Sequence, residues 1–162
     1  MFLQYFKIKR NNYKKQTLSM YQEIVNHSNH FIKNSLNDKH FSFDEVFEIF
    51  SIVTVFYLKK LKDRKTRKNK EISQIIINNF IKDLDQNFRE KGIGDMSIGK
   101  YVKKYVKKFY YRLKILDEIL KENEDINFAS YIKKFGISNY GNSMKISKDL
   151  KILYNNIVID KQ

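Results

Sequence analysis

Apolar residues recur at three- and four-residue steps along most of the chain, which is the spacing of one face of an α-helix. The chain has no proline and only five glycines, so few residues interrupt a helical segment. The pattern predicts helices near residues 17–34, 42–61, 72–91, 95 or 97 to 121, 127–135 and 144–158. We therefore expect an all-α fold, a single-domain helical bundle of about six helices.

Local signals mark some of the helix ends. Ser42 and Glu45 have the spacing of a capping box, in which each side chain bonds the backbone N–H of the other residue. Gly92 is expected to end the third helix in the left-handed conformation, which glycine adopts at low cost. The second helix is apolar nearly all round between Phe47 and Leu58, which predicts that it is buried on every side.

The first sixteen residues are rich in aromatic and basic side chains. They are predicted to form an N-terminal arm, followed by one helical domain over residues 17–162. In this arm the apolar residues precede the basic ones, which is the reverse of a secretory signal. The arm could pack on the bundle or anchor the protein at a membrane surface. We expect a cytoplasmic protein, or one peripheral on the inner face of the inner membrane.

The fourth predicted helix has two contrasting faces. Its apolar stripe is expected to bury Ile98, Tyr101, Val102, Tyr105, Val106, Phe109, Leu113 and Leu116. At 100° per residue its lysines fall on the opposite face, with Arg112 at the edge. Its acidic residues crowd the C-terminal end. This order opposes the helix macrodipole, so helix stability does not account for it.

A second basic segment joins the second and third predicted helices. With the lysine face it forms a candidate basic surface of Lys100, Lys103, Lys104, Lys107, Lys108, Lys59, Lys60, Arg64, Lys65, Arg67 and Lys68. The net charge of +14 favours an acidic partner: RNA, a ribosome or an anionic membrane. The alternative is a merely solvated face, because a high lysine content is also typical of A+T-rich genomes and charge runs often serve only solubility.

The segment REKGIGD between the third and fourth helices is interpreted first as a rigid joint. Gly92 and Gly94 permit positive φ at low cost, and Asp95 can cap the following helix. Asp85 and Arg89 are four residues apart on the third helix, so they can form an ion pair on its surface.

Little in the sequence indicates catalysis. There is no cysteine, which excludes disulfides, thiolate metal sites and thiol nucleophiles. His27 and His30 are three residues apart, but no H-E-x-x-H motif accompanies them, so a core or surface role is favoured over zinc binding. No nucleophile elbow, P-loop or dinucleotide-binding glycine motif is present. We expect a binding protein that is not an enzyme and holds no cofactor or metal.

The stretch DLDQNFREKGIGDMSIGKYVKKYVKKFYYR, from Asp83 to Arg112, resembles the signature of the ubiquinol–cytochrome c chaperone family. The matching residues are Asp85, Arg89, Glu90, Gly92, Gly94, Asp95, Gly99, Lys100, Lys103, Lys104, Phe109, Tyr110 and Arg112. Tyr111 stands where the family usually has glycine, and Lys91 where it usually has methionine. The chain looks most similar to the bacterial form of the family.

The resemblance implies an all-α assembly chaperone for respiratory complex III, without a cofactor or catalytic residues. Its client would be newly made cytochrome b or another complex III subunit, and mitochondrial members act at the ribosome with a small companion protein. The basic surface would then meet a ribosome, its RNA or an anionic membrane. The alternative is a general RNA- or ribosome-binding module, or a peripheral membrane-binding one, without chaperone activity.

Overall fold

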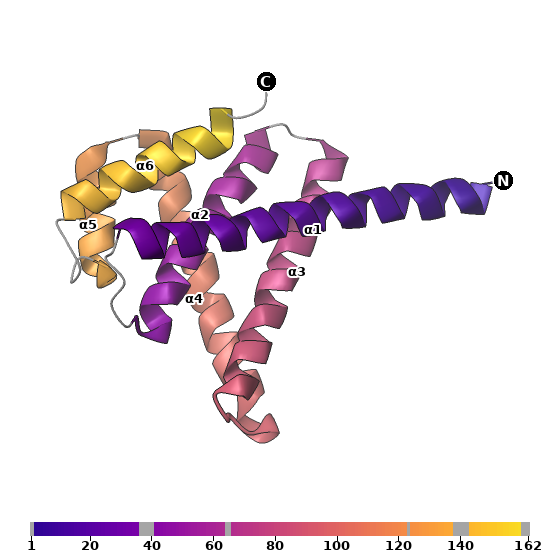
Figure 1. The fold of residues 1–162 in the computed structure, drawn as a ribbon, viewed down its shortest axis with the longest axis horizontal. Helices are drawn as coiled ribbons and strands as arrows, with labels where there is room; N and C mark the ends of the chain where they lie inside the picture. Colours follow the sequence, from indigo (N-terminus) through magenta and orange to yellow (C-terminus); the bar gives the residue numbers. More distant parts are fainter. Residues whose placement is uncertain (1, 36–40, 64–65, 123, 138–142, 160–162) are drawn as a thin grey trace. The chain divides into compact units, whose positions relative to one another are not determined.

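The computed structural model describes the chain except for residues 1, 36–40, 64–65, 123, 138–142 and 160–162, and the side chains of residues 2–13, 35 and 159 are also outside the description. It contains the helices α1 (Phe2–Ser35), α2 (Phe43–Asp63), α3 (Arg67–Glu90), α4 (Asp95–Glu122), α5 (Asp125–Lys134) and α6 (Ser143–Ile159) (Figure 1). No strand occurs in the described part of the chain. The predicted all-α class with six helices is confirmed.

The predicted N-terminal end of α2 is also confirmed. The backbone N–H of Ser42 donates to Glu45 Oε2 at 2.7 Å, and the backbone N–H of Glu45 donates to Ser42 Oγ at 3.3 Å. These reciprocal bonds are the capping box, and they satisfy donors that a helix start leaves open. α3 starts in a similar way, because the backbone N–H of Asn69 donates to the Thr66 hydroxyl at 3.1 Å.

The predicted start of the first helix at Thr17 is wrong, since α1 already begins at Phe2. Residues 2–16 contain neither proline nor glycine, so nothing in them breaks a helix, although their apolar spacing did not point to one. Whether residues 1–16 act as a separate arm stays a prediction, because most of their side chains lie outside the description.

The chain divides into two compact units. The first unit consists of Met1–Glu23 and Leu61–Lys108, and the second unit consists of Ile24–Lys60 and Phe109–Gln162. Each unit has its own buried residues.

In the first unit, α3 and the first half of α4 form a helical hairpin (Figure 1). One stripe of α3 is buried, as its spacing predicts: Ile72, Ile76, Phe80, Leu84 and Phe88. Phe88 packs its ring against those of Tyr101 and Tyr105 on α4, at centroid distances of 5.7 and 5.1 Å. The predicted burial of Tyr101 is wrong: this residue is 43% exposed, because only one side of its ring is covered.

α1 joins the first unit through a polar contact. The Tyr21 hydroxyl donates to Asp83 Oδ2 on α3 at 2.6 Å, and Tyr21 itself is buried. Burial and the hydrogen bond to the Asp83 carboxylate both raise the pKa of Tyr21, because each disfavours the phenolate. The hydroxyl therefore stays a donor over the physiological pH range.

In the second unit, every residue of α2 from 51 to 58 is buried, as its continuous apolar sequence predicts. Phe56 is fully buried and contacts the ring of Phe128 on α5 edge-on at 6.4 Å and that of Tyr154 on α6 at 5.0 Å. These aromatic contacts connect three helices of the unit around one side chain.

Candidate functional site

The joint between α3 and α4 is a tight glycine turn. Gly92 has φ +79°, and its N–H donates to the Arg89 carbonyl at 2.9 Å, while the Ile93 N–H donates to the Phe88 carbonyl at 3.1 Å. This pair of bonds is a Schellman motif, which ends α3 as predicted. The Gly94 carbonyl accepts from the N–H groups of Ser97 and Ile98 at 2.9 and 3.1 Å, so Gly94 takes the N-cap position of α4.

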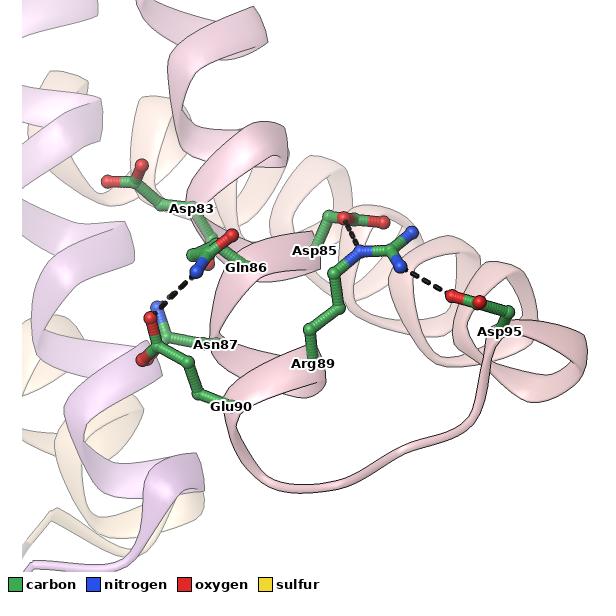
Figure 2. A network of polar contacts seen from close by, with 7 residues as sticks. All are labelled: Asp83, Asp85, Gln86, Asn87, Arg89, Glu90 and Asp95. Atoms are coloured by element: carbon green, nitrogen blue, oxygen red, sulfur yellow. Dashed lines mark hydrogen bonds and ion pairs between the residues drawn. The ribbon is translucent and has the colours of Figure 1, made fainter.

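Arg89 ties the two sides of this turn together (Figure 2). Its Nε donates to Asp85 Oδ2 at 2.6 Å, which confirms the predicted ion pair, and its Nη1 donates to Asp95 Oδ1 at 2.5 Å. The hydrogen bonds to Asp85 and Asp95 raise the pKa of Arg89. Asp95, predicted as the cap of α4, is instead the first residue of that helix, and its carboxylate serves this ion pair.

Glu90, the remaining acidic residue of the joint, points away from this pair. Its Oε1 accepts from the Gln86 side-chain amide at 2.8 Å, on another side of α3 (Figure 2). The residues that match the family signature around the joint thus have local structural contacts. The turn holds the start of α4 in a defined position at the end of the hairpin.

Two glycine substitutions should change stability in opposite directions. We expect Gly92→Ala to lower the free energy of unfolding by about 1–2 kcal/mol, because the left-handed backbone is strained for any residue with a Cβ. Gly99→Ala should raise it by about 0.5–1 kcal/mol, because Gly99 lies inside α4 and alanine favours helices. An added Cβ would meet no atom within 4 Å at either position, so backbone conformation alone decides the sign.

Urea unfolding followed by circular dichroism measures both changes. Gly94→Ala serves as a third variant, since Gly94 has space for a Cβ and no positive φ, and its change should be smaller than that of Gly92. A stabilised Gly92→Ala variant would contradict the left-handed conformation of the turn.

Beyond the joint, α4 presents the predicted lysines to solvent. Lys100, Lys103, Lys104 and Lys107 are exposed, and among the described residues none of them forms an ion pair. Lys108 is half-buried instead, with its ammonium 4.3 Å from the centre of the Tyr105 ring. The four exposed lysines are called the lysine face from here on.

The other basic residues do not form one continuous exposed group. Lys59 is mostly buried and its Nζ lies 3.1 Å from Asp117 Oδ1, while the Nζ of Lys60 donates to the Ile157 carbonyl. Both contacts lie inside the second unit. Arg67 and Lys68 are exposed at the start of α3, and Arg67 pairs with Glu71 at 3.5 Å. Arg64 and Lys65 lie outside the described residues.

A buried ion pair, which was not predicted, lies in the second unit. Arg112 was expected at the edge of the lysine side of α4, but it is only 8% exposed and pairs with Glu48 of α2, which is 4% exposed. The Nε of Arg112 lies 2.9 Å from Glu48 Oε2, and Nη2 lies 2.7 Å from Oε1, so the contact is bidentate. The Tyr131 hydroxyl donates to the same carboxylate at 3.4 Å.

Aromatic rings complete this arrangement. The guanidinium carbon of Arg112 lies 3.7 Å from the centre of the Phe135 ring, and this ring lies tilted against that of Tyr131 at a centroid distance of 4.6 Å. Burial lowers the pKa of Arg112, but the hydrogen bonds and the charge of Glu48 outweigh burial and leave this pKa above its ordinary value. Burial and the Glu48 charge raise the pKa of Tyr131. The guanidinium of Arg112 therefore stays charged, and its Nε and Nη2 donors face the Glu48 carboxylate oxygens.

One signal in the sequence could have indicated this pair. Glu48 is a single carboxylate in an apolar helix segment, and a buried charge requires a partner of opposite sign. The identity of the partner depends on how α2 packs against α4, because Glu48 and Arg112 are 64 positions apart in the sequence.

The aromatic residues beside Arg112 differ in exposure. Phe109 is buried, whereas Tyr110 and Tyr111 each leave about half of their surface exposed on α4. Tyr110 contacts the Phe109 ring edge-on at 5.8 Å. Side by side in the sequence, the two tyrosines provide exposed aromatic surface with hydroxyl groups, as many protein interfaces do.

His27 of α1 contacts Tyr57 of α2, whose hydroxyl lies 3.2 Å from the His27 Nδ1. Within the described part of the chain, no three His, Cys, Asp or Glu side chains gather as metal ligands would. His40 lies outside the described residues. Among the described helices, none has the length and apolar character needed to cross a membrane.

The family described as ubiquinol–cytochrome C chaperone has a sequence model that matches residues 38–135, from just before α2 to the end of α5. The chain belongs to this family. The match includes the glycine joint, the lysine face and both partners of the buried Glu48–Arg112 pair.

A solved structure shares the fold of this family member. The chain is similar to the Cbp3 homolog from Brucella abortus, with a TM-score of 0.81 and 21% sequence identity over 100% of this chain and 91% of that one. No curated protein matches the chain. The sequence match thus shows the family, and the similarity to the solved structure shows the shared fold.

Proposed function

We propose that the chain binds newly made cytochrome b, or another complex III subunit, and presents it for assembly. The observation that carries this proposal is the family match over residues 38–135, which makes the chain a chaperone for complex III. A subunit of a membrane complex exposes apolar surface before it is assembled, and a chaperone must cover part of that surface. No catalytic group is required for such a role.

The exposed tyrosines of α4 are the proposed contact for the client. Tyr110 and Tyr111 are held by a helix whose buried side carries Phe109 and Arg112, so their positions are well supported. A tyrosine side chain offers a large apolar ring at a low cost in side-chain entropy. Such rings suit a client whose own surface is mostly apolar.

The basic residues of the lysine face are the proposed contact for an anionic partner in the cell, a ribosome or a membrane. Four lysines without an ion pair among the described residues favour an external counter-charge. A cytoplasmic position near the inner face of the inner membrane would bring both contacts to the place where cytochrome b is inserted.

Deletion of the gene in the source organism tests the proposed function. We expect less b-type haem in the absorption spectrum of the membranes and a loss of complex III activity, because unassembled cytochrome b is not protected. Restoring the gene should restore both, and Tyr110→Ser with Tyr111→Ser should restore less than the matched control Ile126→Ser with Ile152→Ser, which removes apolar groups elsewhere in the second unit. Normal complex III in the deletion strain would refute the proposal.

Co-purification separates this function from the alternative, an RNA- or ribosome-binding or membrane-binding module without chaperone activity. A tagged chain isolated from gently solubilised cells should carry cytochrome b at high salt as well as low salt. Recovery of ribosomes alone, and only at low salt, would favour the alternative, because phosphate contacts weaken steeply as salt rises.

A further inference from the structure

The end of the α3–α4 hairpin combines an exposed apolar side chain with the lysine face. Met96 is 97% exposed and lies one turn before Lys100 on α4. At 100° per residue, Met96 and the four lysines lie within an arc of about 100° on the helix surface. The most exposed large apolar residue of the described chain therefore belongs to the same face as four lysines.

No contact within the described part of the chain accounts for this arrangement. The four lysines form no ion pair with the described residues. The nearby carboxylates of Asp85 and Asp95 are engaged by Arg89 (Figure 2). Asp95 also falls on the side of α4 opposite to the lysine face. The positive charge of this face is thus uncompensated.

Two neighbouring residues extend this surface. Tyr101, with one side of its ring on Phe88 and 43% of its surface exposed, borders the lysine face. Gly99 lies at the other border, next to Met96 and Lys103, and a Cβ there would meet no atom within 4 Å. Packing within the described residues therefore does not require glycine at this position. The absence of a side chain leaves the backbone of α4 accessible to a close external contact.

We infer that this end of the hairpin, formed by Met96, Tyr101 and the lysine face, binds the surface of an anionic lipid membrane. Lysine ammonium groups bind lipid phosphates, and tyrosine is typical of the interface between lipid headgroups and water. The apolar methionine side chain stabilises binding when it enters the boundary of the acyl chains. A phosphate backbone of RNA would use the lysines but would gain nothing from an exposed methionine. The inference deepens the proposed role of the basic surface and rests on that role.

The rigid joint suits this contact. The Schellman turn at Gly92 and the two ion pairs of Arg89 hold the first turn of α4, so Met96 stays projecting without a flexible loop. Figure 1 shows this turn at the end of the α3–α4 hairpin. A projecting apolar side chain that is held by a turn can insert without unfolding any part of the first unit.

Vesicle co-sedimentation of the full chain tests the inference. The probes are vesicles of phosphatidylcholine alone and of phosphatidylcholine with phosphatidylglycerol. We expect binding only to the second kind, and a loss of about 25-fold or more for Lys103→Glu with Lys107→Glu, since each lysine contributes about fivefold. The matched control is Lys133→Glu with Lys145→Glu, which makes the same charge change at exposed lysines of α5 and α6 and should bind nearly as the parent chain does.

A second measurement distinguishes lipid insertion from charge alone. The chain has no tryptophan, so Met96→Trp introduces a single tryptophan, whose emission can be excited apart from that of the tyrosines, as does the control Ile126→Trp at another exposed apolar position. We expect a blue shift of the emission on anionic vesicles for position 96 and none for position 126. Met96→Ser should weaken vesicle binding by about tenfold and leave circular dichroism unchanged.

Three outcomes would overturn the inference: equal losses for the two charge-reversal pairs, no blue shift at position 96, or vesicle binding that Met96→Ser leaves intact. Tighter binding to polyuridylate than to anionic vesicles, unaffected by Met96→Ser, would assign the surface to RNA instead. Because the purified chain is tested without cytochrome b, normal vesicle binding together with normal complex III in a deletion strain would refute the proposed function but not this inference.

Discussion

Replacing Arg112 by methionine should lower the free energy of unfolding by about 3–5 kcal/mol, because the substitution leaves a buried carboxylate without its partner. Glu48 is 4% exposed, and the guanidinium of Arg112 supplies its bidentate contact at 2.7 and 2.9 Å. The remaining neighbour, the Tyr131 hydroxyl, provides a single long hydrogen bond at 3.4 Å. One neutral donor cannot replace a paired positive charge.

The double variant Glu48→Leu with Arg112→Met should recover most of this loss. It removes both charges and fills the space with apolar groups, and such exchanges of buried ion pairs are often neutral or stabilising. Urea unfolding followed by circular dichroism gives the free energies for the parent, the two single variants and the double variant. The coupling between the two positions follows from this cycle.

The exposed pair of Arg67 and Glu71 is the matched control. Arg67→Met removes the same type of side chain from a surface ion pair at 3.5 Å, and we expect a change within about 0.5 kcal/mol. If Arg112→Met lowered the free energy of unfolding no more than Arg67→Met does, the stability of the protein would not depend on pairing the Glu48 carboxylate with Arg112. A double variant that is as unstable as the single ones would instead assign the loss to packing against Phe135.

Truncating Phe56 to alanine should have an effect of similar size, about 3–5 kcal/mol. Its ring is fully buried between α2, α5 and α6, against Phe128 and Tyr154. Removing it leaves a cavity and also loses two edge-on aromatic contacts. Thermal unfolding by calorimetry, together with urea unfolding, measures this loss.

Two further variants test whether the loss of stability in Phe56→Ala comes from the cavity. Phe56→Leu keeps most of the volume and should cost less than about 1.5 kcal/mol. Met96→Ala removes an apolar side chain that is 97% exposed and should change stability by no more than about 0.5 kcal/mol. A small effect for Phe56→Ala would show that the second unit is not organised around this ring.

Variants at buried positions and variants at exposed positions also separate stability from function. Arg112 and Phe56 act inside the second unit, so their substitution should reduce the amount of folded protein in the cell. The lysine face and Met96 are exposed, so their substitution should leave the fold intact and alter binding only. A loss of complex III with normal protein levels would therefore point to a surface and not to the core.

Features that depend on residues within about four positions of each other can be predicted from the amino-acid sequence alone. The capping box of Ser42 and Glu45, the left-handed Gly92 and the pair of Asp85 and Arg89 are local, and all are present in the structure. The periodic apolar stripe of α3 and the nearly all-apolar segment of α2 likewise identified which of their residues are buried, because burial follows from the pattern of apolar residues on each helix.

Which distant residues meet depends on how the helices pack in three dimensions. Spacing placed Arg112 at the border of the lysines and Tyr101 in the core, but the packing of α2 and α5 buries Arg112, and α3 covers only one side of Tyr101. Similarly, the sequence does not distinguish Lys59 from the exposed basic residues that follow it, whereas in the structure Lys59 pairs with Asp117. A helical repeat specifies the direction of a side chain on its own helix, whereas its partner is set by helices far away in the sequence, and their placement depends on the packing of the whole unit.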